Sequence, residues 1–413
     1  MHVALVYASL VAAEVARPQA STSTSSISTS TTLRSLLSVR GGGGVSGSPG
    51  RKKKPIVVAG SMNADTIIRL NRFPSKGETV TAIDGEGGGV RTIAGGKGAN
   101  QAVAVARLGL TDSTTAHFVG QFGSDAHASM LRSTLLSHDV DISYCRDCVD
   151  CPSGLGLVFL QPDGAVASVV VGGSNAAWPV ADGADEETRE WWAGVQDLVR
   201  GAAALLLQRE VPEHVNERLA EVARAAGVPV VQDVGGEDRP ISDAQLARVD
   251  FVSPNLSELQ RLVGTTRALG DDESVVAAAR ELQARGARNV LVTLGDRGSL
   301  LIPQPAASPS SDASDRQPTV LRQGCCPIPG EGSMVDETGA GDCFRAAFTV
   351  ALVEGKPLPE CLRFAAAAGA VAVSREGAVP AIPSRQDLED LLPLLQEAGE
   401  GDGTGGGQGS SRG

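Results

Sequence analysis

The chain has 413 residues, of which 42% are apolar and 20% charged, the composition of an ordinary water-soluble globular protein with ample length for a core. The formal net charge of −12 argues against nucleic acid and against an acidic membrane surface as partners. One large α/β domain can account for most of this length, because such domains reach about 250 residues or more.

The first 54 residues differ in composition from the rest. They hold seven Lys or Arg residues against one acid, Glu14, and eleven of the twelve residues 21–32 are Ser or Thr. A basic, hydroxyl-rich and acid-poor N-terminus is typical of an organelle transit peptide, particularly a plastid one. We therefore expect residues 1–54 to direct the protein to the plastid. The alternatives are a disordered tail on a cytoplasmic protein and a secretory signal, although the apolar Val3–Ala13 lacks a basic leading segment.

Short apolar runs alternate with longer helical patterns in the body of the chain, residues 55–398. Strands are predicted at Ile56–Ala59, Ala116–Val119, Ala204–Leu207, Val228–Gln232, Phe251–Ser253 and Val290–Leu294. Helices are predicted at Ala99–Leu108, Val215–Ala226, Ser257–Val263, Ser274–Arg285, Ala340–Val353 and Leu358–Val373. Near-continuous apolar strands separated by amphipathic helices predict a three-layer α/β/α domain, with a mostly parallel sheet covered on both faces.

Two stretches interrupt this alternation with paired strand patterns. They are Asp65–Phe73 with Glu78–Ile83, and Ser153–Gln161 with Val166–Gly172. We expect these segments, about 65–84 and 153–172, to form a small β-sheet lid on the main domain.

Two further segments have the composition of unstructured chain. Residues 303–319 are rich in Pro, Ser, Asp and Ala, which predicts a disordered surface insertion between two late strands. Residues 399–413 are rich in Gly and Ser and predict a flexible tail.

Three of the seven cysteines, Cys145, Cys148 and Cys151, form a C-x2-C-x2-C cluster. A structural zinc site usually has four ligands, and no histidine lies nearby in the sequence. We therefore expect reduced surface thiols rather than a metal site, and redox modification of the cluster stays open.

A glycine-rich segment with an acid at its end, Asp336-Glu337-Thr338-Gly339-Ala340-Gly341-Asp342, precedes the apolar run Ala346–Val353. Amides at such a helix start are unsatisfied and favour anions, and glycines let a phosphate approach the backbone. Asp342 among these amides can accept a proton from a hydroxyl while the amides hold the charge on a phosphoryl group. The segment predicts a phosphotransferase; the alternative for Asp342 is a helix-capping carboxylate.

Two more motifs accompany this segment. Gly60-Ser61-Met62-Asn63-Ala64-Asp65 follows the first strand, and Gly95-Gly96-Lys97-Gly98-Ala99-Asn100-Gln101 opens the first helix. With them, the chain resembles the ribokinases of the PfkB sugar-kinase family from about Pro55 to about Leu395. The segment Gln232–Gly236 is similar to that of plant members, which agrees with a plastid location.

The resemblance implies an activity and its partners. The expected reaction is ATP-dependent phosphorylation of D-ribose at O5 to D-ribose 5-phosphate, with Mg²⁺, with K⁺ as a monovalent activator, and with a homodimer formed through the lid. The alternatives are a kinase of the same family that acts on deoxyribose, fructose or a nucleoside, and a catalytically silent plastid homologue that serves as a scaffold.

The resemblance also implies roles for individual residues. Asp342 is the general base, and the main chain of Gly339, Ala340, Gly341 and Asp342 forms the anion hole. The residues implied to bind sugar are Asn63, Asp65, Gly96, Lys97, Asn100, Glu210 and Asp342. Those implied to bind ATP are Asn255, Thr293, Gly295, Asp296, Gly298, Gly341 and Ala366.

Metal ligands follow from the same resemblance. Glu258, in an N-x-x-E motif, would hold Mg²⁺ through water, because Mg²⁺ dehydrates reluctantly. The alternative for this motif is a helix cap. The implied K⁺ ligands, mostly main-chain carbonyls, are Asp336, Thr338, Ala372, Arg375, Gly377 and Ala381. Ala381 departs from the family, in which a serine often supplies a further oxygen.

Overall fold

A computed structural model of the chain describes residues 54–83, 89–109, 115–162, 166–180, 185–236, 239–304, 320–330 and 332–400. The predicted transit peptide apart from Lys54, residues 305–319 of the predicted insertion and residues 401–413 of the predicted tail lie outside the described residues. The chain divides into two units, residues 1–51 and residues 52–413, and every described residue belongs to the second.

The central sheet has eight strands in the order β14-β13-β12-β11-β10-β9-β1-β4. The strands from β12 to β4 run parallel, whereas β13 pairs antiparallel with both of its neighbours, β12 and β14. Their bounds are β1 Ile56–Ala59, β4 Ala116–Val119, β9 Ala204–Leu207, β10 Val230–Asp233, β11 Phe251–Ser253, β12 Asn289–Thr293, β13 Ser299–Ile302 and β14 Leu321–Gln323. The predicted strands of this sheet are confirmed, and the bounds of β10 and β12 shift by one or two residues.

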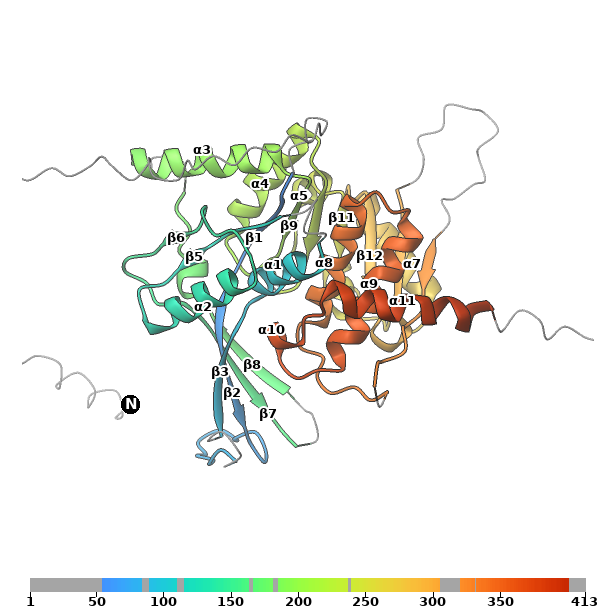
Figure 1. Ribbon diagram of the computed structural model, residues 1–413, viewed down its shortest axis with the longest axis horizontal. Helices are drawn as coiled ribbons and strands as arrows, with labels where there is room; N and C mark the ends of the chain where they lie inside the picture. Colours follow the sequence, from blue (N-terminus) through green and yellow to red (C-terminus); the bar gives the residue numbers. More distant parts are fainter. Residues whose placement is uncertain are drawn as a thin grey trace, which may run out of the picture. The chain divides into compact units, whose positions relative to one another are not determined.

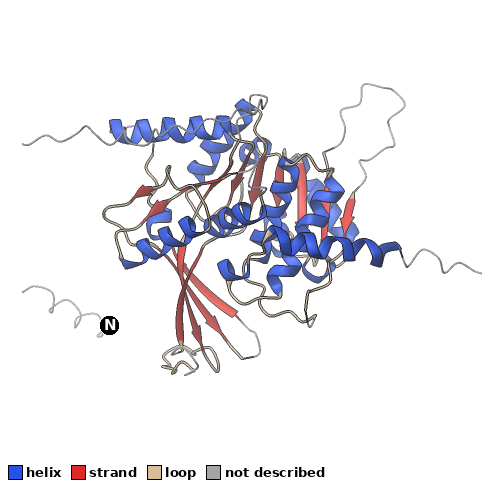
Figure 2. Cartoon of the chain, in the orientation of Figure 1, coloured by secondary structure: helices blue, strands red, loops and turns tan. Residues whose placement is uncertain are grey.

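Helices cover both faces of this sheet (Figure 2). One face packs against α1 Lys97–Leu108, α2 Ala126–Ser137, α8 Ala340–Val353, α9 Leu358–Val373 and α11 Arg385–Glu400, and the other against α3 Glu186–Gly201, α4 Glu213–Ala226, α5 Asp243–Arg248, α6 Leu256–Val263 and α7 Asp272–Ala284. Alternate strand residues enter the two cores, so that Val58 faces one and Val57 the other. The three-layer prediction is confirmed. Within the described ranges no helix has the length and hydropathy needed to cross a membrane.

A second sheet of four strands, in the order β3-β2-β7-β8, projects from the main domain and is the predicted lid (Figure 1). Its strands are β2 Asn63–Arg69, β3 Val90–Gly95, β7 Gly154–Leu160 and β8 Val166–Val171. The prediction of a lid strand at Glu78–Ile83 is wrong. β2 pairs instead with β3, in a register that sets Asn63 opposite Gly95. The chain then continues from β3 directly into α1.

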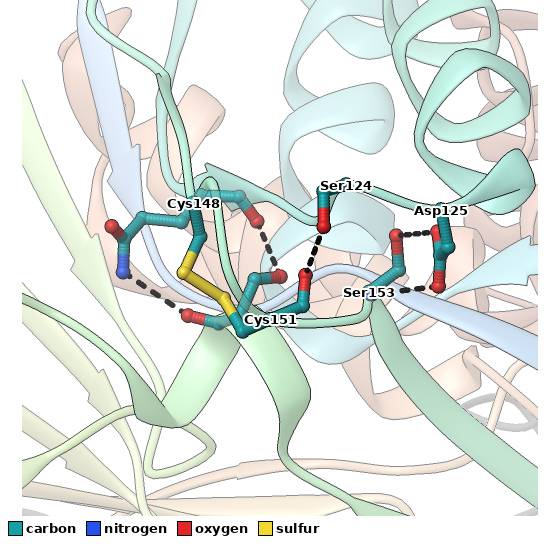
Figure 3. Close-up of a disulfide and its surroundings, with 7 residues drawn as sticks. Ser124, Asp125, Cys148, Cys151 and Ser153 are labelled. Carbon is teal, nitrogen blue, oxygen red and sulfur yellow. Dashed lines mark hydrogen bonds between the residues drawn. A yellow bond between two sulfur atoms is a disulfide. The ribbon is translucent and has the colours of Figure 1, made fainter. Parts of the chain in front are cut away.

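The cysteine cluster lies just before lid strand β7. Cys148 and Cys151 are joined by a disulfide beside Ser124, Asp125 and Ser153 (Figure 3). The expectation of reduced thiols is therefore wrong for two of the three cysteines, because a C-x2-C spacing also permits a bond between neighbours in a loop. The third cysteine of the cluster stays free.

Candidate active site

The first turn of α1 packs on the loop that follows β1. A Cβ on Gly98 would lie 2.6 Å from the amide nitrogen and from the carbonyl oxygen of Ser61, so only glycine permits this approach. The amide of Ala99 donates to the carbonyl of Ser61 at 2.9 Å. Gly96 precedes the helix at a φ of 88°, which also favours glycine. Two of the predicted motifs are thus adjacent.

Asp342 lies in the first turn of α8 and is 5% exposed. Asn100 donates from Nδ2 to its Oδ2 at 2.9 Å, and Gln101 donates from Nε2 to its Oδ1 at 3.0 Å. Gly339, in the left-handed region with φ 76°, is the N-cap residue of α8. Asp342 is therefore not a capping carboxylate; it is an acid fixed among first-turn amides and held by two side chains of α1.

Asp65 on β2 has its carboxylate between two glycines of the neighbouring strands. A Cβ on Gly95 would lie 1.9 Å from its Oδ2, and one on Gly156 would lie 2.2 Å from its Oδ1. Burial, followed by the nearby charges of Glu210 and Asp342, raises the pKa of Asp65 from 3.8 to about 7. A carboxylate so placed gains from hydroxyl donors that replace its lost water.

We expect Asp65→Asn to raise the melting temperature more at pH 8 than at pH 5, while it weakens sugar binding. In the unfolded chain Asp65 releases its proton near pH 3.8, but in the folded protein it does so near pH 7. Between these values the folded state holds the extra proton, so the free energy of unfolding falls as the pH rises. Asparagine does not titrate, so the variant escapes this decrease in the free energy of unfolding, which is larger at pH 8 than at pH 5.

Scanning calorimetry at the two pH values tests this expectation, with the exposed Asp197→Asn as the matched control. An equal change of melting temperature at both pH values would show that Asp65 does not have the raised pKa.

Asn63 is oriented by a residue that no motif predicted, Asn175. Asn175 donates from Nδ2 to Oδ1 of Asn63 at 2.7 Å, and its Oδ1 accepts from the amide of Met62 at 2.9 Å. This leaves the amide nitrogen of the Asn63 side chain as a donor for a ligand. Among the residues that the structure describes, Oδ1 of the buried Asn100 has no hydrogen-bond partner. A buried acceptor without a donor is costly, and a ligand hydroxyl would satisfy it.

Lys97 and Glu210 are both placed at the head of α1. Glu210 accepts with Oε2 from the hydroxyl of Ser61 at 2.5 Å and from the amide of Lys97 at 3.0 Å, so one of its oxygens braces the two motifs. The ammonium of Lys97 lies 3.4 Å from Oδ2 of Asp233. Burial alone would lower the pKa of Lys97, but Asp233 and Asp342 outweigh it and the pKa is raised. Lys97 is a fixed positive charge here.

The predicted nucleotide residues converge on the ends of β11 and β12. Asn255 precedes α6 in a capping box, in which its Oδ1 accepts from the amide of Glu258 at 2.9 Å and Oε2 of Glu258 accepts from its amide at 2.8 Å. Asn255 also bridges Thr293 at the end of β12. At Gly298, with φ 85°, a Cβ would lie 2.1 Å from the carbonyl oxygen of Gln323. Glycine is thus required where β12 turns into β13.

The remaining predicted residues are less closely grouped. Gly295 and the exposed Asp296 form a short 3-10 turn after β12, and the half-buried Ala366 lies on α9. The amide of Ala340 donates to the carbonyl of Glu337 at 3.2 Å, so it is already engaged. The anion hole therefore depends chiefly on the first-turn amides beside it.

Five of the six predicted K⁺ ligands form two hydrogen-bonded groups near the end of α9. The carboxylate of Asp336 accepts from the amide of Thr338 at 2.9 Å and from that of Gly377 at 2.8 Å. The carbonyl of Ala372 accepts from the amide of Arg375 at 3.1 Å. The amide of Asp336 also reaches the end of α9, where a main-chain carbonyl accepts it at 3.3 Å.

The loop that contains Asp336 is hydrogen-bonded to Gly377, and the next residue, Ala378, packs against Gly339 of the predicted anion hole. A Cβ on Gly339 would lie 3.4 Å from Cα of Ala378, in the short helix α10 Ala378–Ala381. Ala381, the sixth predicted ligand, is the buried last residue of that helix. The order of the Asp336 loop is thereby linked to the position of Gly339.

Several residues of the site were not predicted from the sequence. One of them, Gln101, lies in a predicted motif but had no role assigned, and Asp233 belongs to a segment interpreted only as plant-like. The sequence signal for Arg345 is a charged residue directly before the apolar helical run Ala346–Val353. The residues missed are Ser61, Gln101, Asn175, Gln208, Asp233 and Arg345.

A buried acid at a glycine-capped helix start, facing a cradle for hydroxyl groups, defines a phosphotransferase that acts on a polyhydroxyl substrate. The model for "pfkB family carbohydrate kinase" matches residues 53–385, and the chain belongs to this family.

Two proteins of known function and one solved structure are similar to this chain. The chain is 40% identical over 342 residues to a ribokinase of Arabidopsis thaliana, covering 82% of this chain and 81% of that protein. It is 30% identical over 340 residues to a ribokinase of Schizosaccharomyces pombe, covering 82% and 98%. The structure of Arabidopsis thaliana ribokinase complexed with ribose and ATP matches with a TM-score of 0.70 at 39% identity, covering 82% of this chain and 99% of that one.

Proposed function

We propose that this protein transfers the γ-phosphoryl group of ATP to O5 of D-ribose, giving D-ribose 5-phosphate. The observation that carries the proposal is the position of Asp342, buried among first-turn amides of α8 and held by Asn100 and Gln101 beside the sugar cradle. The similarity to ribokinases, one of them solved with ribose and ATP, supports ribose as the sugar.

In this proposal Asp342 takes the proton from the O5 hydroxyl as the oxygen attacks the γ-phosphorus, the bond from the γ-phosphorus to the β–γ bridging oxygen breaks, and ADP leaves. The first-turn amides of Gly341 and Asp342, with the positive end of the α8 dipole, hold the charge that spreads over the phosphoryl oxygens. Asp65, Asn63 and Asn100 fix the sugar through its other hydroxyls, which keeps the attacking oxygen in line.

A coupled assay of ATP consumption with ribose, deoxyribose, fructose and adenosine tests the proposal. Ribose should give the highest kcat/KM, because a sugar that lacks a hydroxyl leaves a buried polar group of the cradle unpaired, at about 1–3 kcal/mol. A higher kcat/KM with deoxyribose, fructose or adenosine would assign the protein to another activity of the family. No ATP consumption with any of the four would favour the scaffold alternative.

Glu258 fits the part of a magnesium-shell residue. Its Oε2 accepts from the amide of Asn255. Its Oε1 lies close to Gly235, where a Cβ would be only 2.6 Å away from it. Across the described ranges no group of three or more His, Cys, Asp or Glu side chains could hold a metal ion. A single carboxylate suits Mg²⁺, which keeps several waters and takes its other ligands from the phosphates. Bound there, Mg²⁺ would neutralise phosphate charge.

Potassium dependence is our expectation for the loop that contains Asp336. Replacing K⁺ by Na⁺ or a bulky organic cation at constant ionic strength should lower kcat several-fold. The reason is that the loop supports Gly339 through Ala378, and a misplacement of about 1 Å can cost about 10²-fold in rate. A set of carbonyl oxygens can favour K⁺ by its size and ligand number.

The departure at Ala381 gives this expectation its own control. Ala381→Ser restores an oxygen and should lower the half-activating K⁺ concentration, whereas Ala381→Val should not. Equal rates in K⁺ and in the organic cation would show that this part of the family resemblance does not hold for the chain.

The lid supports a proposal of a homodimer. Val169, Val170 and Val171 on the edge strand β8 are each about half exposed, as is Val90 on β3. An exposed apolar edge strand invites pairing with a second copy. Light scattering should give the mass of a dimer, and Val170→Lys should shift it to that of a monomer; a monomeric wild type would contradict the proposal.

The N-terminal segment supports a proposal of plastid import, because residues 1–54 are basic, hydroxyl-rich and acid-poor. A fluorescent fusion of residues 1–54 should accumulate in plastids, and the mature chain should begin near residue 50. Diffuse cytosolic fluorescence would favour the cytoplasmic alternative without affecting the kinase proposal.

A further inference from the structure

Arg345 is a buried arginine one turn beyond Asp342 on α8, and it is 3% exposed. Its guanidinium donates to the last residue of β11: Nε to the hydroxyl of Ser253 at 3.0 Å, and the NH2 nitrogen to the carbonyl of Ser253 at 2.8 Å. The NH1 nitrogen lies 3.5 Å from Oδ2 of Asp233, and NH2 lies 3.7 Å from Oε2 of Glu258. One cation therefore contacts two carboxylates.

Asp233, the last residue of β10, is completely buried. Its Oδ1 accepts from the amide of Gly235 at 2.8 Å. Its Oδ2 accepts from Nε2 of Gln101 at 3.0 Å and from the ammonium of Lys97 at 3.4 Å, and faces Arg345. Burial alone would raise the pKa of Asp233, but Arg345 and Lys97 outweigh it and the pKa is lowered. Asp233 is thus a charged centre that four groups share.

These contacts join the two halves of the site. Lys97 and Gln101 belong to α1 on the sugar side, and the same Nε2 of Gln101 also holds the proposed base Asp342. Glu258 belongs to α6 on the nucleotide side, and α6 packs on the opposite face of the sheet from α1. The Asp233–Arg345 pair connects them at the carboxyl ends of β10 and β11.

Stability alone does not explain such a pair. Burying two charges costs several kcal/mol of hydration for each, and apolar residues of similar volume often serve the folded state equally well. Here the other side-chain contacts of the pair lead to Lys97, Gln101 and Glu258, and to Ser253 and the amide of Gly235 at the ends of the two strands.

We propose that Arg345 and Asp233 are positioning residues for phosphoryl transfer, a buried ion pair that holds the sugar-side groups Lys97 and Gln101 and the nucleotide-side Glu258 at a fixed separation. This inference rests on the proposed function, because it assigns the pair to the same reaction. In this proposal each of the two acts through the groups that it holds, and Arg345 also borders the anion-hole turn, where a Cβ on Gly341 would lie 2.6 Å from its NH1 nitrogen.

The test compares Asp233→Asn, Arg345→Gln and the double variant with the wild type. Arg345→Gln leaves the buried Asp233 with Lys97 as its remaining cation, and Asp233→Asn leaves the buried Arg345 with Glu258 as its remaining carboxylate, so both should lower the melting temperature. The double variant removes both charges and should regain much of it. Its kcat should nevertheless stay at least about tenfold below that of the wild type, because Lys97 and Glu258 are no longer held together. Recovery of kcat together with the melting temperature would overturn the inference.

A binding measurement separates positioning from folding. Calorimetry gives the affinity for ribose and for a non-hydrolysable ATP analogue with Mg²⁺, each alone and in the presence of the other. In the wild type each ligand should strengthen binding of the other, and the double variant should lose this coupling while it still binds each ligand. Equal coupling in both proteins, or none in either, would overturn the inference.

Arg385→Gln is the matched control. Arg385 pairs with Glu354 at 2.6 Å, at the other end of α8 from the site. Its loss should lower the melting temperature and leave both kcat and the coupling unchanged. Failure of the wild type to phosphorylate ribose counts against the proposed function, whereas failure of this inference appears as a double variant that is as active as the wild type.

Discussion

Asp342→Asn should reduce kcat by at least about 10²–10⁴-fold while the melting temperature changes little. Asparagine has nearly the same shape, but it cannot accept the proton of the attacking hydroxyl. The two oxygens of Asp342 now accept from Asn100 at 2.9 Å and from Gln101 at 3.0 Å. The amide oxygen of an asparagine can still accept from Gln101, and Asn100 can turn its amide so that its Oδ1 accepts from the new Nδ2. Single-turnover kinetics with ribose and ATP measure the chemical step directly.

The control for this variant is the affinity for the ATP analogue with Mg²⁺, which should stay close to that of the wild type. Retention of more than about a tenth of the wild-type kcat would rule out Asp342 as the base. Loss of both nucleotide binding and fold would instead assign it a structural part.

Gly235→Ala should lower kcat/KM by about 10²-fold without unfolding the protein, because reacting groups displaced by about 1 Å cost that much. The new Cβ would lie 2.6 Å from Oε1 of Glu258, 2.8 Å from Cε of Lys97 and 2.9 Å from its Nζ. These atoms are the ends of two flexible side chains, so they can move aside at little cost in stability. Glu258 is the proposed magnesium-shell residue and Lys97 a predicted sugar-binding residue, so a shift of both side chains should slow the reaction.

Gly201→Ala is the matched control for this variant. A Cβ on Gly201, at the end of α3, would meet nothing within 4 Å, and alanine favours the helix by up to about 1 kcal/mol. It should leave kcat/KM unchanged and leave the melting temperature equal or higher. Unchanged kcat/KM in Gly235→Ala would show that Lys97 and Glu258 do not need their present separation.

The sequence predicted what depends on local pattern. Apolar strands such as Ile56–Ala59 and long helices such as Ala340–Val353 are confirmed with their bounds, because buried parallel strands and strongly apolar helices have distinctive periodicity. The lid was predicted only in part. In Glu78–Ile83 apolar residues alternate with threonines, which predicts a strand, but β2 pairs with Val90–Gly95, which lacks this alternation.

The site shows the same limit. Asp342, Asn100 and Lys97 were predicted, because each lies in a glycine-rich motif whose backbone has a recognisable use. Asn175 and Arg345 were not, because their parts arise from tertiary contacts with residues 112 and 92 positions away in the chain, Asn63 and Ser253. A residue that acts through another side chain leaves no motif of its own.

The glycines beside Asp65 also restrict how this enzyme could evolve toward other substrates. Any side chain at Gly95 or Gly156 would occupy the space of the Asp65 carboxylate, so we expect a substitution at either position to displace this predicted sugar-binding group. Asp65 itself is free of that restriction, since shortening it opens room between the two glycines. A laboratory library that seeks a kinase for a different sugar should therefore vary position 65 and keep both glycines fixed.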